Sequence, residues 1–432
     1  MLFWSELKKT IVGIPYLLFA IVVVIALNSQ GVLNFSNDKV IEPNPTANQN
    51  YGIKNEEIPE LIMPAAIEAL YTEFLQNRYQ TYPIGFVKYV KLNDDEQRKV
   101  AEIIAAITNI EIEKIYASQD SCSDRNDNAI VVGDNANIQP DENGGFVISL
   151  ESSIAEEVQK DLELSVRKDM PYSQFKELMQ SVDDILGGGS NYAAESLIGY
   201  GHVPITYEEA VRRYELVKNR DRFTGGYARL FSDYAVAMTF SILPVFLAVI
   251  IAMKDKRAKM SELIYIRKIS SAKIITMRFL AVLVAAMLPV IVLSYISNIS
   301  IWNLYPEMKL DYLAPLKYDL GWILPSAMIT AAVGICLTEL TDTPIAVAVC
   351  ALWWFIDVNL GMKSVSASCT LFRLAPRHNS GTKSYFRTQD YIDHFPKILA
   401  NRLLFTGLSI VLVVGTIFIY EAKRKGKFLW KK

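Results

Sequence analysis

Residues 279–299 read FLAVLVAAMLPVIVLSYISNI and contain no charged side chain. As a helix rising ~1.5 Å per residue, this stretch would cross a hydrocarbon core of roughly 30 Å. Backbone groups inside a bilayer must satisfy their own hydrogen bonds, so an isolated apolar run of this length is expected to be helical. Five more runs of similar length and composition follow the same argument: 10–27, 234–253, 320–337, 345–362 and 403–420. The sequence therefore predicts an α-helical polytopic membrane protein with six transmembrane helices.

The charges of the chain are segregated in the same way as its apolar residues. Residues 30–229 hold 33 acidic and 19 basic side chains, whereas the rest of the 432 residues hold 13 acidic and 25 basic ones. A soluble enzyme, a disordered chain and a nucleic-acid-binding protein are poor fits to this distribution. We expect one large water-exposed domain, mostly helical with some strand, attached to the membrane helices.

The basic residues predict the orientation. Segment 254–278 has eight basic and two acidic residues, tail 421–432 has six and one, and Lys8 and Lys9 precede the first span. With six spans all three lie on one side, which the positive-inside rule makes cytoplasmic. Segment 363–397, with six basic and two acidic residues, disagrees because it falls outside. A cleaved signal peptide is the alternative for the first span, although no convincing cleavage site follows Leu27.

This topology divides the chain into six parts. They are an interfacial helix and first span (1–28), an extracytoplasmic domain (29–229), a second span (230–253), a cytoplasmic loop (254–278), four further spans with an extracytoplasmic loop at 363–402 (279–420), and a basic cytoplasmic tail (421–432). The expected location is a bacterial plasma membrane, with both termini in the cytoplasm.

Local signals predict several elements of the extracytoplasmic domain. Asp94 and Asp95 can cap a helix ending near Thr108, and a Thr206/Glu209 capping box precedes a helix ending near Lys218. Glycines 187–189 should stop a helix that begins near Ser173. Alternation predicts strands at 86–92 and 146–150, and the polar segment 118–145 is expected to be a loop.

We find no pattern for catalysis or metal binding in that domain. Asp124, Asn126 and Asn128 begin like a calcium loop, but Ala129 and Asn135 replace its glycine and its bidentate glutamate. The three histidines lack metal spacing, and the glycine triplet is not a phosphate-binding loop. Of the cysteines, Cys336 and Cys350 fall in spans. Cys122 and Cys369 are the only pair predicted outside, where they either form a disulfide or remain thiols.

The cytoplasmic segment 254–279 reads KDKRAKMSELIYIRKISSAKIITMRF. Residues 256–265 can form a short helix with Met260, Leu263 and Ile264 on one face. Ser270 or Ser271 can then cap a helix that continues into the third span. Such a helix can serve as a lever that a partner grips, or it can rest on anionic lipid. The charges explain both functions equally well.

This loop resembles the corresponding element of the ATP-binding-cassette type-2 permease family. An E-L-I-Y-like run, residues 262–265, leads to Ile269 and Ser270 and then to the basic helix start at Lys273. The layout of one span, a large exterior insertion and five spans is similar to one subgroup of that family. Family members often have proline before the I-S pair, where this chain has Lys268.

The resemblance implies a permease half of an exporter for a hydrophobic or amphipathic substrate such as a peptide, drug or lipid. A separate ATPase subunit, carrying ATP and Mg²⁺, would bind the loop, and a second permease would complete the pathway. The chain itself would hold no cofactor and no ATPase site, in line with the lack of a Walker A motif. The implied coupling residues are Arg257, Met260, Glu262, Leu263, Ile264, Tyr265, Arg267 and Ser270.

Other features are open to more than one interpretation. Asp357 is the one acid well inside a predicted span, which makes it a pathway candidate, but its place near the outer interface would let it reach water. Glu339 and Asp342 fall in a predicted cytoplasmic turn. Each of the first four spans contains a proline that favours a kink: Pro15, Pro244, Pro289 and Pro325. Two rival functions remain. A membrane-anchored sensor should have fewer spans and a larger cytoplasmic output domain, and an intramembrane enzyme should have paired acids or His-rich motifs within its spans.

Overall fold

The computed structural model describes residues 2–35, 39–45, 50–83, 87–116, 136–140, 146–150, 164–266, 268–359, 369–376 and 384–426. The chain forms two compact units. One unit joins Met1–Gln49 to Tyr207–Lys432, and the other is Asn50–Thr206. Helix is the predominant secondary structure, as the sequence predicts.

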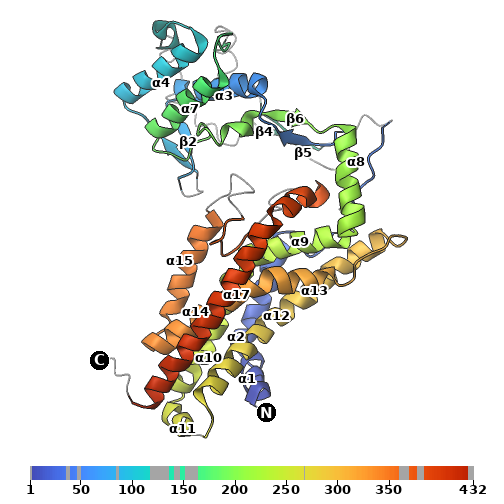
Figure 1. The fold of residues 1–432 in the computed structure, drawn as a ribbon, viewed down its shortest axis with the longest axis vertical. Coiled ribbons are helices and arrows are strands. Elements are labelled where there is room, and N and C mark those ends of the chain that lie inside the picture. The colour runs from blue at the N-terminus through green and yellow to red at the C-terminus, as the bar shows by residue number, and fades with distance from the viewer. Residues whose placement is uncertain are drawn as a thin grey trace. The chain divides into compact units, whose positions relative to one another are not determined.

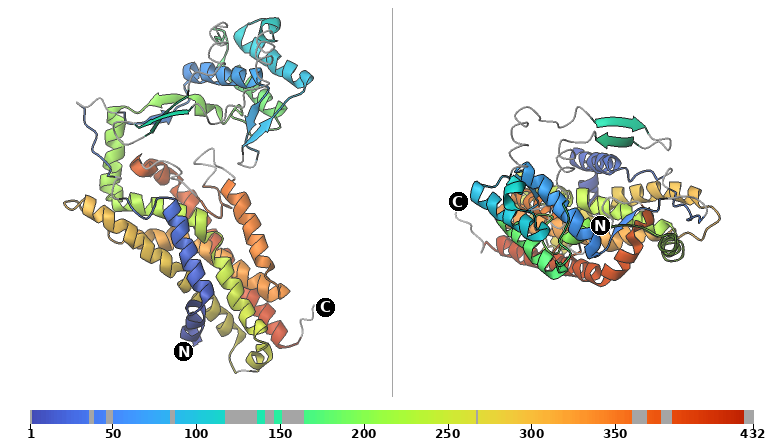
Figure 2. Two further views of the ribbon diagram at one scale, coloured as in Figure 1. Left: turned by 180° about the vertical axis from the view of Figure 1, so that it is seen from behind. Right: turned by 90° about the horizontal axis from the view of Figure 1, so that it is seen from above.

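The larger unit is a helical bundle in which α14 lies against α10, α12, α15 and α17 (Figure 1). Its α-helices are α1 (Leu2–Ile11), α2 (Ile14–Ser29), α8 (Tyr207–Leu216), α9 (Thr224–Ala235), α10 (Pro244–Arg257), α11 (Ser261–Tyr265), α12 (Ser271–Leu304), α13 (Ala314–Tyr318), α14 (Leu324–Thr341), α15 (Ile345–Asn359) and α17 (Thr388–Arg424). Wider π-type turns at Val217–Asp221, Val236–Phe240 and Asp319–Ile323 and a 3₁₀ turn at Ser384–Arg387 join some of them. In Figure 2, seen from behind, α2 lies along α12 and α10.

Within the described residues, three helices are long and apolar enough to cross a membrane: Ser271–Leu304, Ala314–Thr341 and Thr388–Arg424. A fourth candidate is the pair α1 and α2, which meet at 66°. α15 is apolar but shorter. Their outward faces remain apolar, as in lipid-facing helices: Leu288, Leu352 and Leu403 are all exposed. A membrane protein is therefore supported, with three or four candidate spans.

The segment expected to form one helix over 234–253 is interrupted. Its first part belongs to α9 and the π turn, a three-residue turn follows, and α10 begins only at Pro244. Proline has no amide hydrogen to donate, which suits the first turn of a helix better than its interior. Pro15 likewise stands at the start of α2. Pro289 lies inside α12, and Pro325 lies inside the continuous helix Ala314–Thr341, of which α14 is the last part.

Among its described residues, the smaller unit has three two-stranded antiparallel sheets and several helices. The sheets pair β1 (Ile53–Asn55) with β6 (His202–Pro204), β2 (Tyr79–Thr81) with β3 (Lys88–Val90), and β4 (Ala136–Pro140) with β5 (Phe146–Leu150). Its helices include α3 (Pro59–Leu75), α4 (Asp94–Thr108), α7 (Tyr172–Ile185) and a 3₁₀ turn at Leu197–Tyr200. Leu70, Ile104 and Phe175 from the three α-helices are fully buried in one core.

Several predicted elements of this unit are confirmed, with corrections. The helix ending at Thr108 is capped by Asn93, whose side chain and that of Glu96 form a capping box, and not by Asp94 or Asp95. Glycines 187–189 have positive φ and stop α7 as expected. The strand at 146–150 is present, but β4 interrupts the region expected to be a loop. The calcium-like residues 124–135, Cys122 and His378 lie outside the described residues.

Candidate functional site

The cytoplasmic loop predicted from the sequence forms two helical pieces. α10 continues through Lys256 and Arg257, and the chain turns at Lys259, whose φ is 54°. α11 then covers Ser261–Tyr265. The continuous helix expected over 256–265 is therefore wrong, because the left-handed conformation of Lys259 ends α10 and redirects the chain. Met260 precedes α11 instead of lying within a helix.

Three apolar side chains around α11 face away from the bundle. Met260 is 44% exposed, Leu263 53% and Ile266 77%. Ile264 and Tyr265 are half-buried and pack against the main core of the larger unit. Leu263 of α11 and its neighbours Met260 and Ile266 thus offer exposed apolar surface, whereas Ile264 and Tyr265 pack against the bundle. We call Met260, Leu263 and Ile266 the α11 face.

The C-terminal end of α17 holds this segment in place. Arg424 donates from Nε to the carbonyl oxygen of Tyr265 and from Nη1 to that of Ile269, each at 2.7 Å. The rings of Tyr265 and Tyr420 meet edge to face at 5.5 Å between centroids. Hydrogen bonds from a guanidinium are stronger than those between neutral groups. α11 is therefore coupled directly to the last helix.

The start of α12 is fixed at the same place. Ser270 is the N-cap, and its Oγ accepts a hydrogen bond from the amide of Lys273 at 3.3 Å. This selects Ser270 from the two predicted capping residues. The neighbouring hydroxyl of Ser271 donates to the carboxylate of Glu421 on α17. The middle of the loop between α10 and α12, at Tyr265, and its end, at Ile269 and Ser271, are thus tied to α17.

A group of charged residues lies behind α11, where five helices meet. We call this group the end cluster; it comprises Glu6 of α1, Asp255 and Lys256 of α10, Arg278 of α12, Glu339 and Asp342 at the end of α14, and Lys423 of α17. Arg278, only 5% exposed, is its centre. It bonds Asp255, and its Nε and Nη1 lie 3.7 Å from Glu6 Oε2 and 3.8 Å from Glu339 Oε1.

Lysines complete the end cluster nearer the surface. Lys256 Nζ lies 3.4 Å from Glu339 Oε2 and also pairs with Asp342, whose Oδ1 is 2.7 Å from Lys423 Nζ. Burial alone would lower the pKa of Lys256, but the two carboxylates outweigh it and raise that pKa. Although burial opposes it, hydrogen bonds from the two lysines lower the pKa of Asp342. Glu339 belongs to α14 and is buried, so its prediction as a turn residue is corrected.

The remaining predicted coupling residues are less informative. Arg257 is exposed at the end of α10, with its Nη2 3.8 Å from the sulfur of Met253. The side chain of Glu262 and all of Arg267 lie outside the described residues. The structure brings together Leu263, Ile264, Tyr265 and Ser270 in one short segment, with Met260 beside them.

Asp357 does not reach water, contrary to the sequence-based expectation. It is 4% exposed and accepts hydrogen bonds from the amides of Leu374 and Ala375 at 2.8 and 3.0 Å. Arg402 of α17 donates to the hydroxyl of Ser326 at 2.7 Å and to the carbonyl of Trp322 at 2.9 Å. Together these residues bind segment 369–376 to α14, α15 and α17. The geometry gives Asp357 an anchoring contact to the backbone.

A second network of charges encloses Arg229 of α9. Its two terminal nitrogens bond the two carboxylate oxygens of Asp221 at 2.5 and 2.6 Å. Thr388 accepts from Arg229 at 3.0 Å and donates to Asp221 at 2.6 Å, and Tyr391 offers its ring 4.6 Å from the guanidinium carbon. We call Asp221, Arg229, Thr388 and Tyr391 the Arg229 clamp.

The sequence did not identify the end cluster or the Arg229 clamp. Their members come from distant segments, and nothing in one sequence says which of many charges will meet. The signal that was available is the position of Arg278 about two turns inside the long apolar helix α12, since a charge there needs a partner. Within the described ranges no three His, Cys, Asp or Glu side chains could jointly hold a metal ion.

Comparison with family models, with curated proteins and with solved structures finds no match to this chain.

Proposed function

We propose that this chain is the permease subunit of an ATP-driven transporter, and that α11 is the element to which a separate ATPase subunit binds. The observation that carries the proposal is the two-sided character of α11. Its α11 face is apolar and exposed, while its other side is bonded to α17 through Arg424 and Tyr420. Force applied to such an element is transmitted to the membrane helices and not absorbed by a loose loop.

The end cluster supports the same mechanism. Arg278 and its carboxylate partners link α1, α10, α12 and α14 at the point where α11 is attached. Buried charges need oppositely charged partners to be tolerated, so the helix ends that carry them stay together. A displacement of α11 would therefore be shared among several helices. In the proposed cycle, ATP and Mg²⁺ are bound by the partner subunit, and this chain supplies the moving helices.

The proposed topology has six spans, with both termini and α11 in the cytoplasm of a bacterial cell. The spans would be the α1/α2 pair, the α9–α10 segment, α12, α13 with α14, α15, and α17. The unit Asn50–Thr206 would lie outside. A second permease subunit would complete a pathway for export of a hydrophobic or amphipathic substrate such as a peptide, drug or lipid.

Co-purification tests the proposal. The full-length chain, solubilised in detergent from its native membrane, should bring down a nucleotide-hydrolysing subunit. Leu263→Asp puts a charge on the α11 face and should reduce recovery of that subunit at least tenfold, because a buried unpaired charge disfavours an apolar interface. Leu61→Asp is the matched control, since Leu61 is 43% exposed in the other unit.

Equal recovery with wild-type and Leu263→Asp chains would contradict binding through α11. Recovery of no nucleotide-hydrolysing protein at all would overturn the transporter proposal and favour a membrane-anchored sensor, in which the unit Asn50–Thr206 binds a ligand. A permease subunit is therefore expected to co-purify with a nucleotide-hydrolysing protein, whereas a sensor is not.

A further inference from the structure

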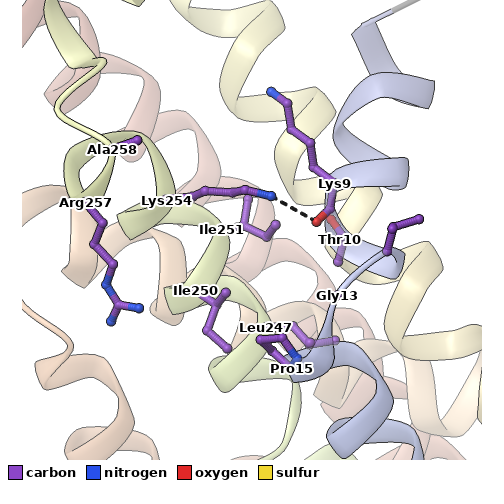
Figure 3. Close-up of a pocket in the computed structure, with 11 residues that line it drawn as sticks. Lys9, Thr10, Gly13, Pro15, Leu247, Ile250, Ile251, Lys254, Arg257 and Ala258 are labelled. Carbon is purple, nitrogen blue, oxygen red and sulfur yellow. Dashed lines mark hydrogen bonds between the residues drawn. The ribbon is translucent and has the colours of Figure 1, made fainter.

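A cavity of about 460 Å³ lies between α10 and the bend that joins α1 to α2 (Figure 3). Its size falls within the range of ~300–1,000 Å³ that is usual for small-molecule clefts. The bend occurs at Gly13, followed by Pro15 at the start of α2. Because α1 leaves the direction of α2 at this point, the two helices open a space beside α10 that a straight helix would fill.

Basic groups line one end of the cavity. Lys254 and Arg257 come from α10, and Lys9 comes from α1 (Figure 3). Lys254 Nζ donates to the carbonyl oxygen of Lys9 at 3.3 Å, which draws the lysine across the opening. Lys9 is paired with Glu6 at 2.7 Å, but among the described residues neither Lys254 nor Arg257 pairs with a carboxylate. The cavity therefore carries positive charge that other described residues do not neutralise.

The other end of the cavity is apolar. Leu247, Ile250 and Ile251 lie on the same face of α10 as Lys254, at helical spacing, and Val12 and Pro15 line the opposite wall. At ~1.5 Å per residue, Leu247 lies about 10 Å along the axis from Lys254. No Asp or Glu is among the described lining residues. One helix face thus changes from apolar to basic over roughly the distance between acyl chains and head groups in a bilayer.

We propose that this cavity binds an anionic phospholipid. Its phosphate would lie against Lys254, and the exposed Arg257 side chain would turn toward it from the position in Figure 3. Its first methylenes would lie against Ile250 and Val12. The acyl chains would continue along α2, where Leu17, Leu18 and Ile25 are all more than half exposed. The proposal requires that α2 and α10 lie in a membrane and does not depend on an ATPase partner. Basic pockets between membrane helices have the chemistry that anionic head groups require.

Native mass spectrometry of the detergent-solubilised full-length protein tests this site. Dioleoyl phosphatidylglycerol should be retained at least tenfold better than dioleoyl phosphatidylcholine. Each basic residue near an anionic surface contributes a factor of about five to binding, so the double variant Lys254→Gln/Arg257→Gln should retain phosphatidylglycerol about 25-fold less. The control Lys8→Gln/Lys273→Gln removes two exposed charges outside the cavity and should retain it like the wild type.

Two further experiments distinguish a lipid site in this cavity from binding through charge alone. Ile250→Trp fills the apolar end without altering charge and should also reduce retention, while circular dichroism checks that the variant is folded. Inorganic phosphate in large excess should not displace the lipid. Equal retention of both lipids, unchanged retention by the cavity double variant, or displacement by phosphate alone would each overturn the proposal.

Discussion

The Arg229 clamp and the end cluster solve the problem of a buried arginine in different ways. Arg229 is 1% exposed and meets one carboxylate through two parallel bonds, with Thr388 bridging both partners. Arg278 is almost as buried but shares three carboxylates, two of them at distances beyond a direct hydrogen bond. The clamp is a closed pair, whereas the end cluster is a shared network that extends to the surface at Asp342.

This difference indicates which region can change its arrangement. A bidentate pair between a planar guanidinium and a carboxylate has one good geometry, so Arg229 of α9 is fixed to Asp221 in the turn before it. Thr388 then ties this pair to the start of α17. A network in which Glu339 and Asp342 each have alternative cationic partners can exchange partners at smaller cost. The network, and not the closed pair, lies beside α11, where the proposed function requires movement.

The largest effect should follow from opening the closed pair. Arg229→Met leaves Asp221 charged and buried, and should lower the free energy of unfolding by about 3–5 kcal/mol. Thermal unfolding in detergent, read from intrinsic fluorescence, measures it. The double variant Arg229→Met/Asp221→Leu removes both charges and should recover most of the loss. A single variant as stable as the wild type would contradict the clamp as a rigid joint.

A smaller effect is expected in the end cluster. Glu339→Gln removes one carboxylate from Arg278 and Lys256, but Asp255, Glu6 and Asp342 remain to compensate. The loss should be below about 2 kcal/mol, because the contacts of Glu339 with Arg278 at 3.8 Å and Lys256 at 3.4 Å are longer than a good hydrogen bond to a charged group. Thermal unfolding of Glu339→Gln, measured in parallel with that of Arg229→Met, tests this difference between the end cluster and the Arg229 clamp. A loss as large as that of Arg229→Met would mean that the network is as closed as the clamp.

The smallest effect concerns pH. The lowered pKa of Asp342 stabilises the fold above its usual value of 3.8, and this contribution is lost as the pH falls through the lowered pKa. The raised pKa of Lys256 stabilises the fold below the usual value of 10.5 for lysine, and this stabilisation is lost as the pH rises through the raised pKa. The ion pairs of Asp342 and Lys256 within the end cluster should thus persist from about pH 5 to 9.

Asp342 is 56% exposed, so its contribution should be below about 1 kcal/mol. Unfolding of the wild type and of Asp342→Asn should differ slightly at pH 7, and this difference should shrink below pH 3.8. A difference that stays constant down to pH 3 would show that the Asp342 carboxylate is not its source.

The sequence predicted those parts of the fold that depend on neighbouring residues. Apolar runs located most of the long helices, the glycines after Ile185 located a helix end, and Ser270 was one of two predicted caps. The break at Lys259 could not be predicted, because lysine gives no signal for a positive φ. The break before Pro244 agrees with the kink predicted at that proline, but the length of the turn before it depends on how the segment packs.

The candidate site was predicted only in its local part. The sequence placed Leu263 and Tyr265 together, but Tyr265 is bonded to Arg424, 159 residues away. Glu6, Arg278 and Glu339 are likewise distant in sequence, and their meeting depends on the packing of three helices. The expectation that Asp357 reaches water was wrong for the same reason, since its partners Leu374 and Ala375 lie on a distant segment that covers it.

The central claim is that α11 faces the cytoplasm. Met260→Cys, in a chain whose four native cysteines are replaced by serine, can be labelled with a membrane-impermeant maleimide in intact cells and after permeabilisation. We predict that labelling occurs only after permeabilisation, whereas Lys99→Cys, at an exposed position of α4, is labelled in intact cells. Labelling of Met260→Cys in intact cells would contradict the account.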